Sequence, residues 1–181
     1  ANGSYSGHRA LEQEFSEFYN CQSSIVFTTG YQANLAMISG LAGANDVILI
    51  DGDSHASIYD GCKLSGAEII RFRHNDMVDM EKRLKRLGER ASSTLIIIEG
   101  IYSMLGDRAP LADIVKIKNS YGSILLLDEA HSIGVLGKTG QGLVEETGLI
   151  NEVDFITGTF SKSLGSIGGY CVSNHMQLDQ L

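Results

Sequence analysis

Short apolar segments alternate with longer amphipathic segments along the whole chain. Some of the apolar segments are unbroken runs, such as Leu95–Ile98 and Ile124–Leu127. Short runs without polar alternation are typical of strands that are covered on both faces, as in a parallel sheet. The pattern predicts strands at Ser24–Thr28, Val47–Asp51, Glu68–Arg73, Thr94–Glu99, Ile124–Asp128, Asp154–Gly158 and Gly169–Val172.

The segments between these strands have the period of amphipathic helices. In the clearest one, Met77, Met80, Leu84 and Leu87 share one face, and Gly88 ends the pattern. Strands that alternate with helices in this way predict an α/β fold, with three layers and a mostly parallel sheet flanked by helices. The predicted helices are Arg9–Tyr19, Tyr31–Leu41, Ala56–Leu64, Asp76–Leu87 and Leu111–Tyr121.

Composition agrees with one globular domain and disfavours several classes of protein. A chain of 181 residues is long enough for one domain with a single core, which we expect over residues 1–181. The formal charge of −8 argues against nucleic acid or an anionic membrane as the main partner. No apolar run reaches the roughly 18 residues that a membrane-spanning segment needs. Cys21, Cys62 and Cys171 are widely spaced, so we expect reduced thiols, no metal site and a cytoplasmic protein.

Polar residues gather directly after the predicted strands. In parallel α/β sheets, ligands bind at the carboxyl ends of the strands, so these residues are the candidates for function. A purely structural domain would need few of them. They are Thr29-Gly30-Tyr31, Asp53-Ser54-His55, Glu99-Gly100-Ile101-Tyr102-Ser103, Asp128-Glu129-Ala130-His131 and Thr159-Phe160-Ser161-Lys162.

Two of the segments have a superficial likeness to nucleotide hydrolases. Asp128–His131 is similar to the acidic box of certain helicases, and Gly137-Lys138-Thr139 is similar to the end of a P-loop. The glycine that a P-loop needs five positions before Gly137 is Ser132 here, and the order of the two motifs is reversed. The sequence therefore argues against nucleotide hydrolysis.

Five segments together resemble the enzymes of fold-type I that use pyridoxal 5′-phosphate (PLP), and among them the α-oxoamine synthase family. Each segment alone is a weak signal, but all five occur in the order of the family. The resemblance covers essentially the whole chain. The segments are Thr29–Asn34, His55–Ile58, Glu99–Met104, Asp128–Gly134 and Gly158–Ser163.

The resemblance implies catalytic roles for four residues. Lys162 matches the lysine that holds PLP as a Schiff base. Asp128 matches the carboxylate that keeps the pyridine nitrogen protonated, so that the ring acts as an electron sink. His131 matches the histidine that hydrogen-bonds the 3′-oxygen of PLP, and His55 matches the histidine that stacks on the ring. A surface lysine, a strand-end aspartate and a core histidine are the plainer interpretations.

The same resemblance implies a site for the cofactor phosphate. Gly30 and Tyr31 open a predicted helix, where backbone N–H groups and the helix dipole favour an anion. Thr159 and Ser161 precede the lysine and offer hydroxyl groups. Ser103 matches a family serine near the 3′-oxygen, although a turn residue explains it equally well.

A further segment near the start of the chain is similar to a family stretch that approaches the active site. Helix capping explains part of this pattern equally well. Leu105 stands where the family usually has an acidic residue, which leaves the substrate side of the site open. The matching residues of the stretch are Gly3, His8, Leu11 and Glu12.

The reaction implied by the resemblance is a Claisen-type condensation of an amino acid with an acyl-CoA, with release of CoA and usually CO₂. Lys162 is the expected base for the α-proton. The family's pairs are serine with palmitoyl-CoA, alanine with a pimeloyl thioester, and glycine with acetyl-CoA or succinyl-CoA. The motifs slightly favour serine with palmitoyl-CoA, while Gly106–Leu111 suits the pimeloyl reaction equally well.

The resemblance also implies a homodimer with a shared active site, and a small C-terminal domain beyond residues 1–181. Two other classes stay open, namely a non-catalytic partner subunit and a plain aminotransferase. A non-catalytic subunit would typically lack the Schiff-base lysine, and a plain aminotransferase would act with a 2-oxo acid and not with acyl-CoA.

Overall fold

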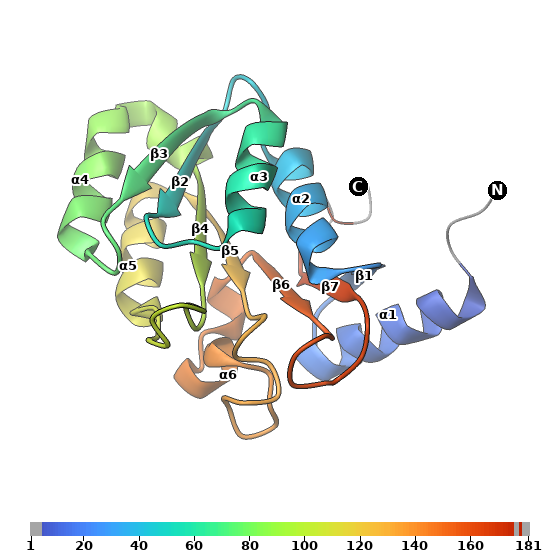
Figure 1. Cartoon of the computed structure of the whole chain (residues 1–181). Coiled ribbons are helices and arrows are strands. Elements are labelled where there is room, and N and C mark those ends of the chain that lie inside the picture. Colours follow the sequence, from blue (N-terminus) through green and yellow to red (C-terminus); the bar gives the residue numbers. More distant parts are fainter. Residues whose placement is uncertain (1–4, 176–177, 179–181) are drawn as a thin grey trace.

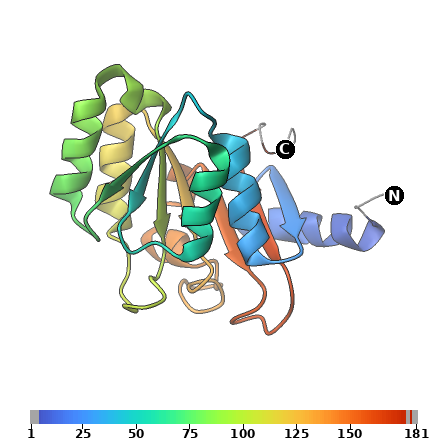
Figure 2. The same ribbon diagram turned by 45° about the horizontal axis from the view of Figure 1, so that its top comes forward.

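A computed structural model describes residues 5–175 and residue 178, and its backbone forms one seven-stranded sheet with helices on both faces (Figures 1 and 2). The short 3₁₀ helices are labelled η1 and η2. The elements are α1 (Ser6–Tyr19), β1 (Ser23–Phe27), α2 (Gly30–Leu41), β2 (Val47–Asp51), α3 (Ala56–Ser65), β3 (Glu68–Phe72), α4 (Met77–Leu87), η1 (Gly88–Ser93), β4 (Leu95–Glu99), α5 (Leu111–Tyr121), β5 (Ile124–Asp128), α6 (Leu143–Thr147), η2 (Ile150–Glu152), β6 (Phe155–Thr159) and β7 (Gly169–Ser173).

The strands lie in the order β1-β7-β6-β5-β4-β2-β3. Neighbours from β6 to β3 pair in parallel, whereas β7 pairs antiparallel with both β6 and β1. Among the described strands, β7 alone therefore runs against the others. The predicted three-layer α/β fold with a mostly parallel sheet is confirmed, and each strand ends within one residue of its predicted bounds.

The central strands are buried on both faces, as their unbroken apolar runs predict. Ile96 and Ile98 of β4 pack in the same cluster as Met80 of α4, on the face that α1, α4, α5 and α6 cover. Ile97 packs on the opposite face with Ile38 of α2, where α3 also lies. All five side chains are fully buried. Because successive residues of a strand point to opposite faces, one apolar run supplies both layers of the core.

Two helical elements differ from the sequence prediction. Helix α1 begins at Ser6 rather than at Arg9, where the backbone N–H of Tyr5 donates to Nδ1 of His8 (3.3 Å). This bond gives His8 a role in helix capping, which was the alternative explanation of the N-terminal stretch to which it belongs. Helix α6 was not predicted, because its five residues are too few to show a period. Gly3 lies outside the described residues.

The carboxyl ends of β2, β4, β5 and β6 meet at one edge of the sheet, toward which their arrowheads point in Figure 1. The last residues of these strands are Asp51, Glu99, Asp128 and Thr159. Parallel pairing thus brings together polar residues that are far apart in sequence. Within the described part of the chain, no helix is both long enough and apolar enough to cross a membrane.

Candidate active site

A cavity of about 220 Å³ lies at this edge of the sheet. It receives residues from the ends of β4, β5 and β6, from the loops that follow β1, β2, β5 and β6, and from the N-terminal parts of α2 and α3. All of the predicted site residues except Ser103 line it. The full lining is Thr29, Gly30, Tyr31, Asn34, His55, Ser57, Glu99, Asp128, Ala130, His131, Gly158, Thr159, Ser161 and Lys162.

Lys162 lies in the loop that follows β6, and its Nζ is 2.7 Å from Nε2 of His131. Partial burial lowers the pKa of Lys162, although the charges of Asp128 and Glu99 oppose the shift. Burial, together with the charge of Lys162, also lowers the pKa of His131. A neutral imidazole can accept a hydrogen bond from the lysine, and a lysine with a lowered pKa is more often a free, nucleophilic amine.

Asp128 ends β5, and its side chain is buried at the cavity wall. Its Oδ1 accepts from the backbone N–H of Ala130 (2.8 Å), and its Oδ2 accepts from Nδ2 of Asn34 (2.7 Å). Two donors from different elements fix the plane of the carboxylate, and each oxygen keeps a lone pair for a further donor. Asp128 is therefore an oriented acceptor for a cationic N–H group in the cavity.

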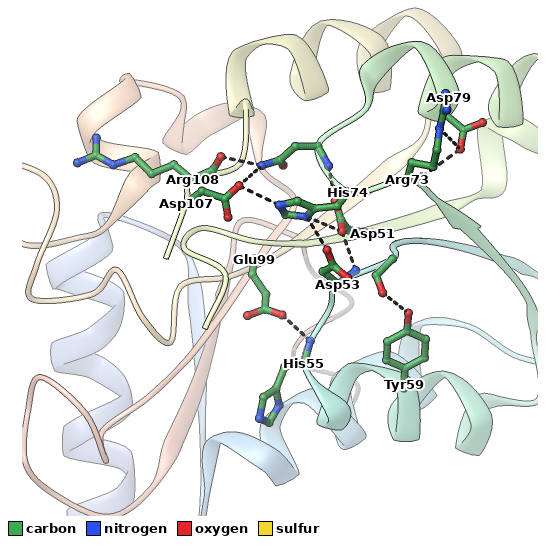
Figure 3. A network of polar contacts seen from close by, with 12 residues as sticks. Asp51, Asp53, His55, Tyr59, Arg73, His74, Asp79, Glu99, Asp107 and Arg108 are labelled. Carbon is green, nitrogen blue, oxygen red and sulfur yellow. Dashed lines mark hydrogen bonds and ion pairs between the residues drawn. The ribbon is translucent and has the colours of Figure 1, made fainter. Parts of the chain in front are cut away.

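His55 is the N-cap residue of α3, and its ring is held by the first turn of that helix. Nδ1 accepts from the backbone N–H of Ser57 (3.2 Å) and lies 2.8 Å from the Ser57 hydroxyl. Figure 3 shows the backbone N–H of His55 donating to the carboxyl group of Glu99. Burial, followed by the nearby charge of Asp128, raises the pKa of Glu99 to about 8. The end of β4 thus holds the backbone of His55, and the first turn of α3 holds its ring at the cavity.

The opposite part of the cavity has the features of an anion site. Helix α2 begins at Gly30, and Thr29 caps it by accepting from the backbone N–H of Gln32 (3.0 Å). The hydroxyl groups of Thr159 and Ser161 lie 2.9 Å apart beside this helix start. Free backbone N–H groups, the positive end of a 12-residue helix and two hydroxyl groups together favour a phosphate.

Comparison of the chain with known proteins identifies its family. The family described as aminotransferase class I and II matches residues 2–181. The chain belongs to this family. Within the family it is related to the α-oxoamine synthases, because its relatives include serine palmitoyltransferases and 8-amino-7-oxononanoate synthases.

Three relatives show how similar the chain is to known proteins, and over what share of their length. The serine palmitoyltransferase of Caulobacter vibrioides is 59% identical over 99% of the chain and 44% of that protein. The serine palmitoyltransferase of S. paucimobilis, solved with bound PLP–myriocin, is 49% identical with a TM-score of 0.94, over 98% of the chain and 44% of that structure. The 8-amino-7-oxononanoate synthase of Geotalea daltonii is 39% identical over 99% of the chain and 46% of that protein. The chain thus spans less than half the length of these relatives.

The sequence analysis gave no role to three polar residues that line this cavity. Asn34, Ser57 and Glu99 all line it, and each is at least 97% buried. All three residues lie within the motifs quoted above, so the sequence contained a signal for them. Their hydrogen-bond partners include residues of other helices, strands or loops, and these contacts could not be predicted from the motifs. Ser103 has the opposite outcome, since it lies in an exposed turn and does not line the cavity.

Gly30 has no room for a side chain. A Cβ atom there would lie 2.6 Å from Cβ of Thr159 and 2.8 Å from its hydroxyl oxygen. We therefore expect Gly30→Ala to lower the free energy of unfolding by about 1–3 kcal/mol, the usual cost of overpacking. Urea denaturation measures the effect. Gly7→Ala is the matched control, because Gly7 has nothing within 4 Å of its Cβ position. Equal stability of Gly30→Ala and the unmodified protein would contradict the close approach.

A second polar cluster lies next to the cavity and connects the turn after β4 to the end of β2 (Figure 3). His74 contacts Asp51 through Nδ1 and Asp107 through Nε2, each at 2.9 Å. Asp51 is fully buried and also accepts from the backbone N–H groups of Asp53 and Asn75. Because both ring nitrogens face carboxylates, the cluster suits a protonated imidazole.

The His74 cluster makes stability depend on pH. Burial alone would lower the pKa of His74, but the hydrogen bonds to Asp107 and Asp51 outweigh it, and the pKa is raised. This contribution is therefore fully present below the unfolded-state pKa near 6.5 and is lost as pH rises through the folded-state pKa. We expect His74→Gln to cost about 2 kcal/mol at pH 6 and clearly less at pH 9. Thermal unfolding at both pH values measures this difference, and an equal cost at both would contradict it.

Proposed function

We propose that the protein containing this chain is a PLP-dependent acyltransferase that condenses an amino acid with an acyl-CoA and releases CoA and CO₂. The observation that carries the proposal is the placement of Lys162, whose amine lies in the cavity 2.7 Å from His131 and has a lowered pKa. Serine and palmitoyl-CoA are the proposed substrates, since two serine palmitoyltransferases are 59% and 49% identical to the chain, whereas a putative 8-amino-7-oxononanoate synthase is 46% identical.

The residues of the cavity fit PLP. Lys162 offers an amine for the aldehyde carbon, and the oriented carboxylate of Asp128 offers an acceptor for the protonated pyridine nitrogen. The start of α2 at Gly30, with the hydroxyls of Thr159 and Ser161, offers donors for the phosphate. Tyr31, which the sequence placed in the phosphate site, lines the same region with 42% of its surface exposed.

In the proposed reaction, PLP supplies an electron sink that delocalises the negative charge left at the amino-acid α-carbon when its proton is lost. Lys162 takes this proton, because its lowered pKa keeps a fraction of the amine free at neutral pH. Neutral His131 accepts a hydrogen bond from Lys162 and holds its Nζ in position. With PLP bound, Asp128 would keep the ring nitrogen protonated, and His55 would contact the ring and could assist the acyl step.

The whole protein's assembly and location are proposed on the same basis. We propose that the chain is the PLP-binding large domain of the protein. We propose a homodimer with a shared active site, which is supported by the exposure of Met104 and Ile167 (91% and 84%). A cytoplasmic location stays a prediction from the sequence.

The 8-amino-7-oxononanoate synthase reaction is the second candidate, since the relative from Geotalea daltonii matches 99% of the chain at 39% identity. A further candidate of the same reaction class, 2-amino-3-ketobutyrate CoA ligase, would use glycine with acetyl-CoA. A non-catalytic partner subunit and a plain aminotransferase are the alternatives from other classes. The lysine in the cavity argues against the former.

Release of free CoA, followed with a thiol reagent over a panel of amino acids and acyl-CoAs, tests the proposed function in the full-length protein. We expect the fastest release with L-serine and palmitoyl-CoA, and none when either substrate is omitted. Release that requires alanine and pimeloyl-CoA would support the 8-amino-7-oxononanoate synthase reaction instead. Transamination of a 2-oxo acid without any CoA release would contradict the acyltransferase.

A further inference from the structure

We propose that Asn34 is a positioning residue, whose side-chain amide fixes the carboxylate of Asp128 and connects it to the ring of His55 through the hydroxyl of Ser57. The inference rests on the proposed function, because the two residues at the ends of this connection are the ones that hold the PLP ring. Asn34 itself acts only through its neighbours.

Every hydrogen-bonding group of the Asn34 amide has a partner. Nδ2 donates to Oδ2 of Asp128 (2.7 Å) and to Oγ of Ser57 (3.0 Å). Oδ1 accepts from the hydroxyl of Thr157 (2.9 Å). The side chain is 3% exposed, and Asp128, Ser57 and Thr157 are also buried. A buried amide with three partners has one orientation, so it holds its neighbours in one arrangement.

The chemistry of the partners sets the direction of each bond. An ionised Asp128 has no proton to give, so the NH₂ group of Asn34 must face it. Ser57 then accepts from Asn34, and its own proton is free to donate to Nδ1 of His55, 2.8 Å away. Nδ1 also receives the backbone N–H of Ser57. His55 is thereby held as the tautomer that carries its proton on Nε2.

The helix packing around Asn34 makes this arrangement possible. Asn34 lies on α2 and Ser57 on α3, while Asp128 and Thr157 belong to the neighbouring strands β5 and β6. Helices α2 and α3 approach closely at Gly61, where a Cβ atom would lie 3.1 Å from the backbone oxygen of Asn34. The amide therefore sits where two helices meet the end of the sheet, and it connects the carboxylate side of the ring site to the histidine side.

A purely structural asparagine would affect stability alone, so the test measures the bound cofactor. In the full-length protein, PLP is titrated into Asn34→Leu, which keeps the branched shape of the side chain, and into Ser57→Ala. We expect the Kd for PLP to rise about tenfold in Asn34→Leu, the effect of losing one hydrogen bond to a charged group. Ser57→Ala, which keeps the bond to Asp128, is expected to raise Kd by about threefold. In both variants the pH midpoint of the absorption spectrum of bound PLP should shift.

Asn151→Leu is the matched control, because Asn151 is exposed on η2. The Kd for PLP and the pH midpoint of this variant should equal those of the unmodified protein. An unchanged Kd and an unchanged midpoint in Asn34→Leu would overturn the inference, even if the variant is less stable. If Asn34→Leu does not fold, Thr157→Val replaces it. This variant removes only the hydroxyl that orients the amide, and an unshifted midpoint in both Thr157→Val and Ser57→Ala overturns the inference.

Borohydride trapping separates this inference from the proposed function. We expect PLP to be trapped on Lys162 in the unmodified protein and in every variant, because none of the substitutions touches the lysine. An unmodified protein that takes no label at Lys162 overturns the proposed function itself, and the inference about Asn34 with it. A label at Lys162, with Kd values and midpoints that are the same in all variants, overturns the inference alone.

Discussion

Replacing Lys162 with alanine is expected to lower kcat/KM for CoA release by at least about 10⁴-fold, the upper end of what one positioned acid–base group contributes. The amine has two tasks in the proposed reaction, since it both binds the cofactor and takes the α-proton. Its lowered pKa and its contact with His131 show that the cavity is arranged around this group. The fold should survive the change, because the side chain is exposed to the cavity.

Steady-state kinetics with the thiol assay measures this loss, and thermal unfolding checks the fold. Lys82→Ala is the matched control, because Lys82 is exposed on α4, on the far side of the sheet from the helices α2 and α3. The control should retain the full rate. A Lys162→Ala protein with more than a hundredth of the original kcat/KM would mean that another residue is the base.

Asp128→Asn is expected to lower kcat/KM by about 10²–10³-fold, a typical loss when one electrostatic contact in a buried site is removed. The substitution keeps the shape but removes the charge that holds the ring nitrogen protonated. It also disturbs the local hydrogen bonds, because Asp128 accepts from Ala130 on one oxygen and from Asn34 on the other. An asparagine has one side-chain oxygen, so one of these donors must face an NH₂ group.

The same assay measures the effect of Asp128→Asn, and Asp113→Asn on the exposed surface of α5 is its control. We expect the Asp128 variant still to take a borohydride label at Lys162, because the lysine is untouched. A variant with more than a tenth of the original kcat/KM would contradict the role of the carboxylate.

The sequence predicted the strands well because the physical signal is local. An unbroken apolar run such as Leu95–Ile98 places apolar side chains on both faces of a strand, which suits a strand that helices cover on both sides. The position of Asp128 at the end of such a run, and of Lys162 after a further predicted strand, then predicted the edge at which they meet. Helix α6 escaped prediction because five residues carry no period, and the start of α1 depends on a capping bond rather than on apolar spacing.

The polar network could not be predicted from the sequence, because its meaning depends on distant partners. Asn34 and Asp128 are 94 positions apart, yet they share a hydrogen bond once α2 packs against the sheet. In the sequence, Glu99 is one more acidic residue at a strand end. In the structure, the pairing of β2 with β4 brings it to the backbone N–H of His55. Ser103 shows the reverse, since a motif position alone placed it at the site and the turn leaves it exposed outside the cavity lining.

Binding of PLP to Lys162 in this cavity can be tested directly. PLP is added to the full-length protein, the complex is reduced with borohydride, and the modified peptide is mapped by mass spectrometry. We expect a single pyridoxyl group, on the Nζ atom of Lys162. Absence of any stable adduct, or a label on another lysine while Lys162 stays unmodified, would contradict it.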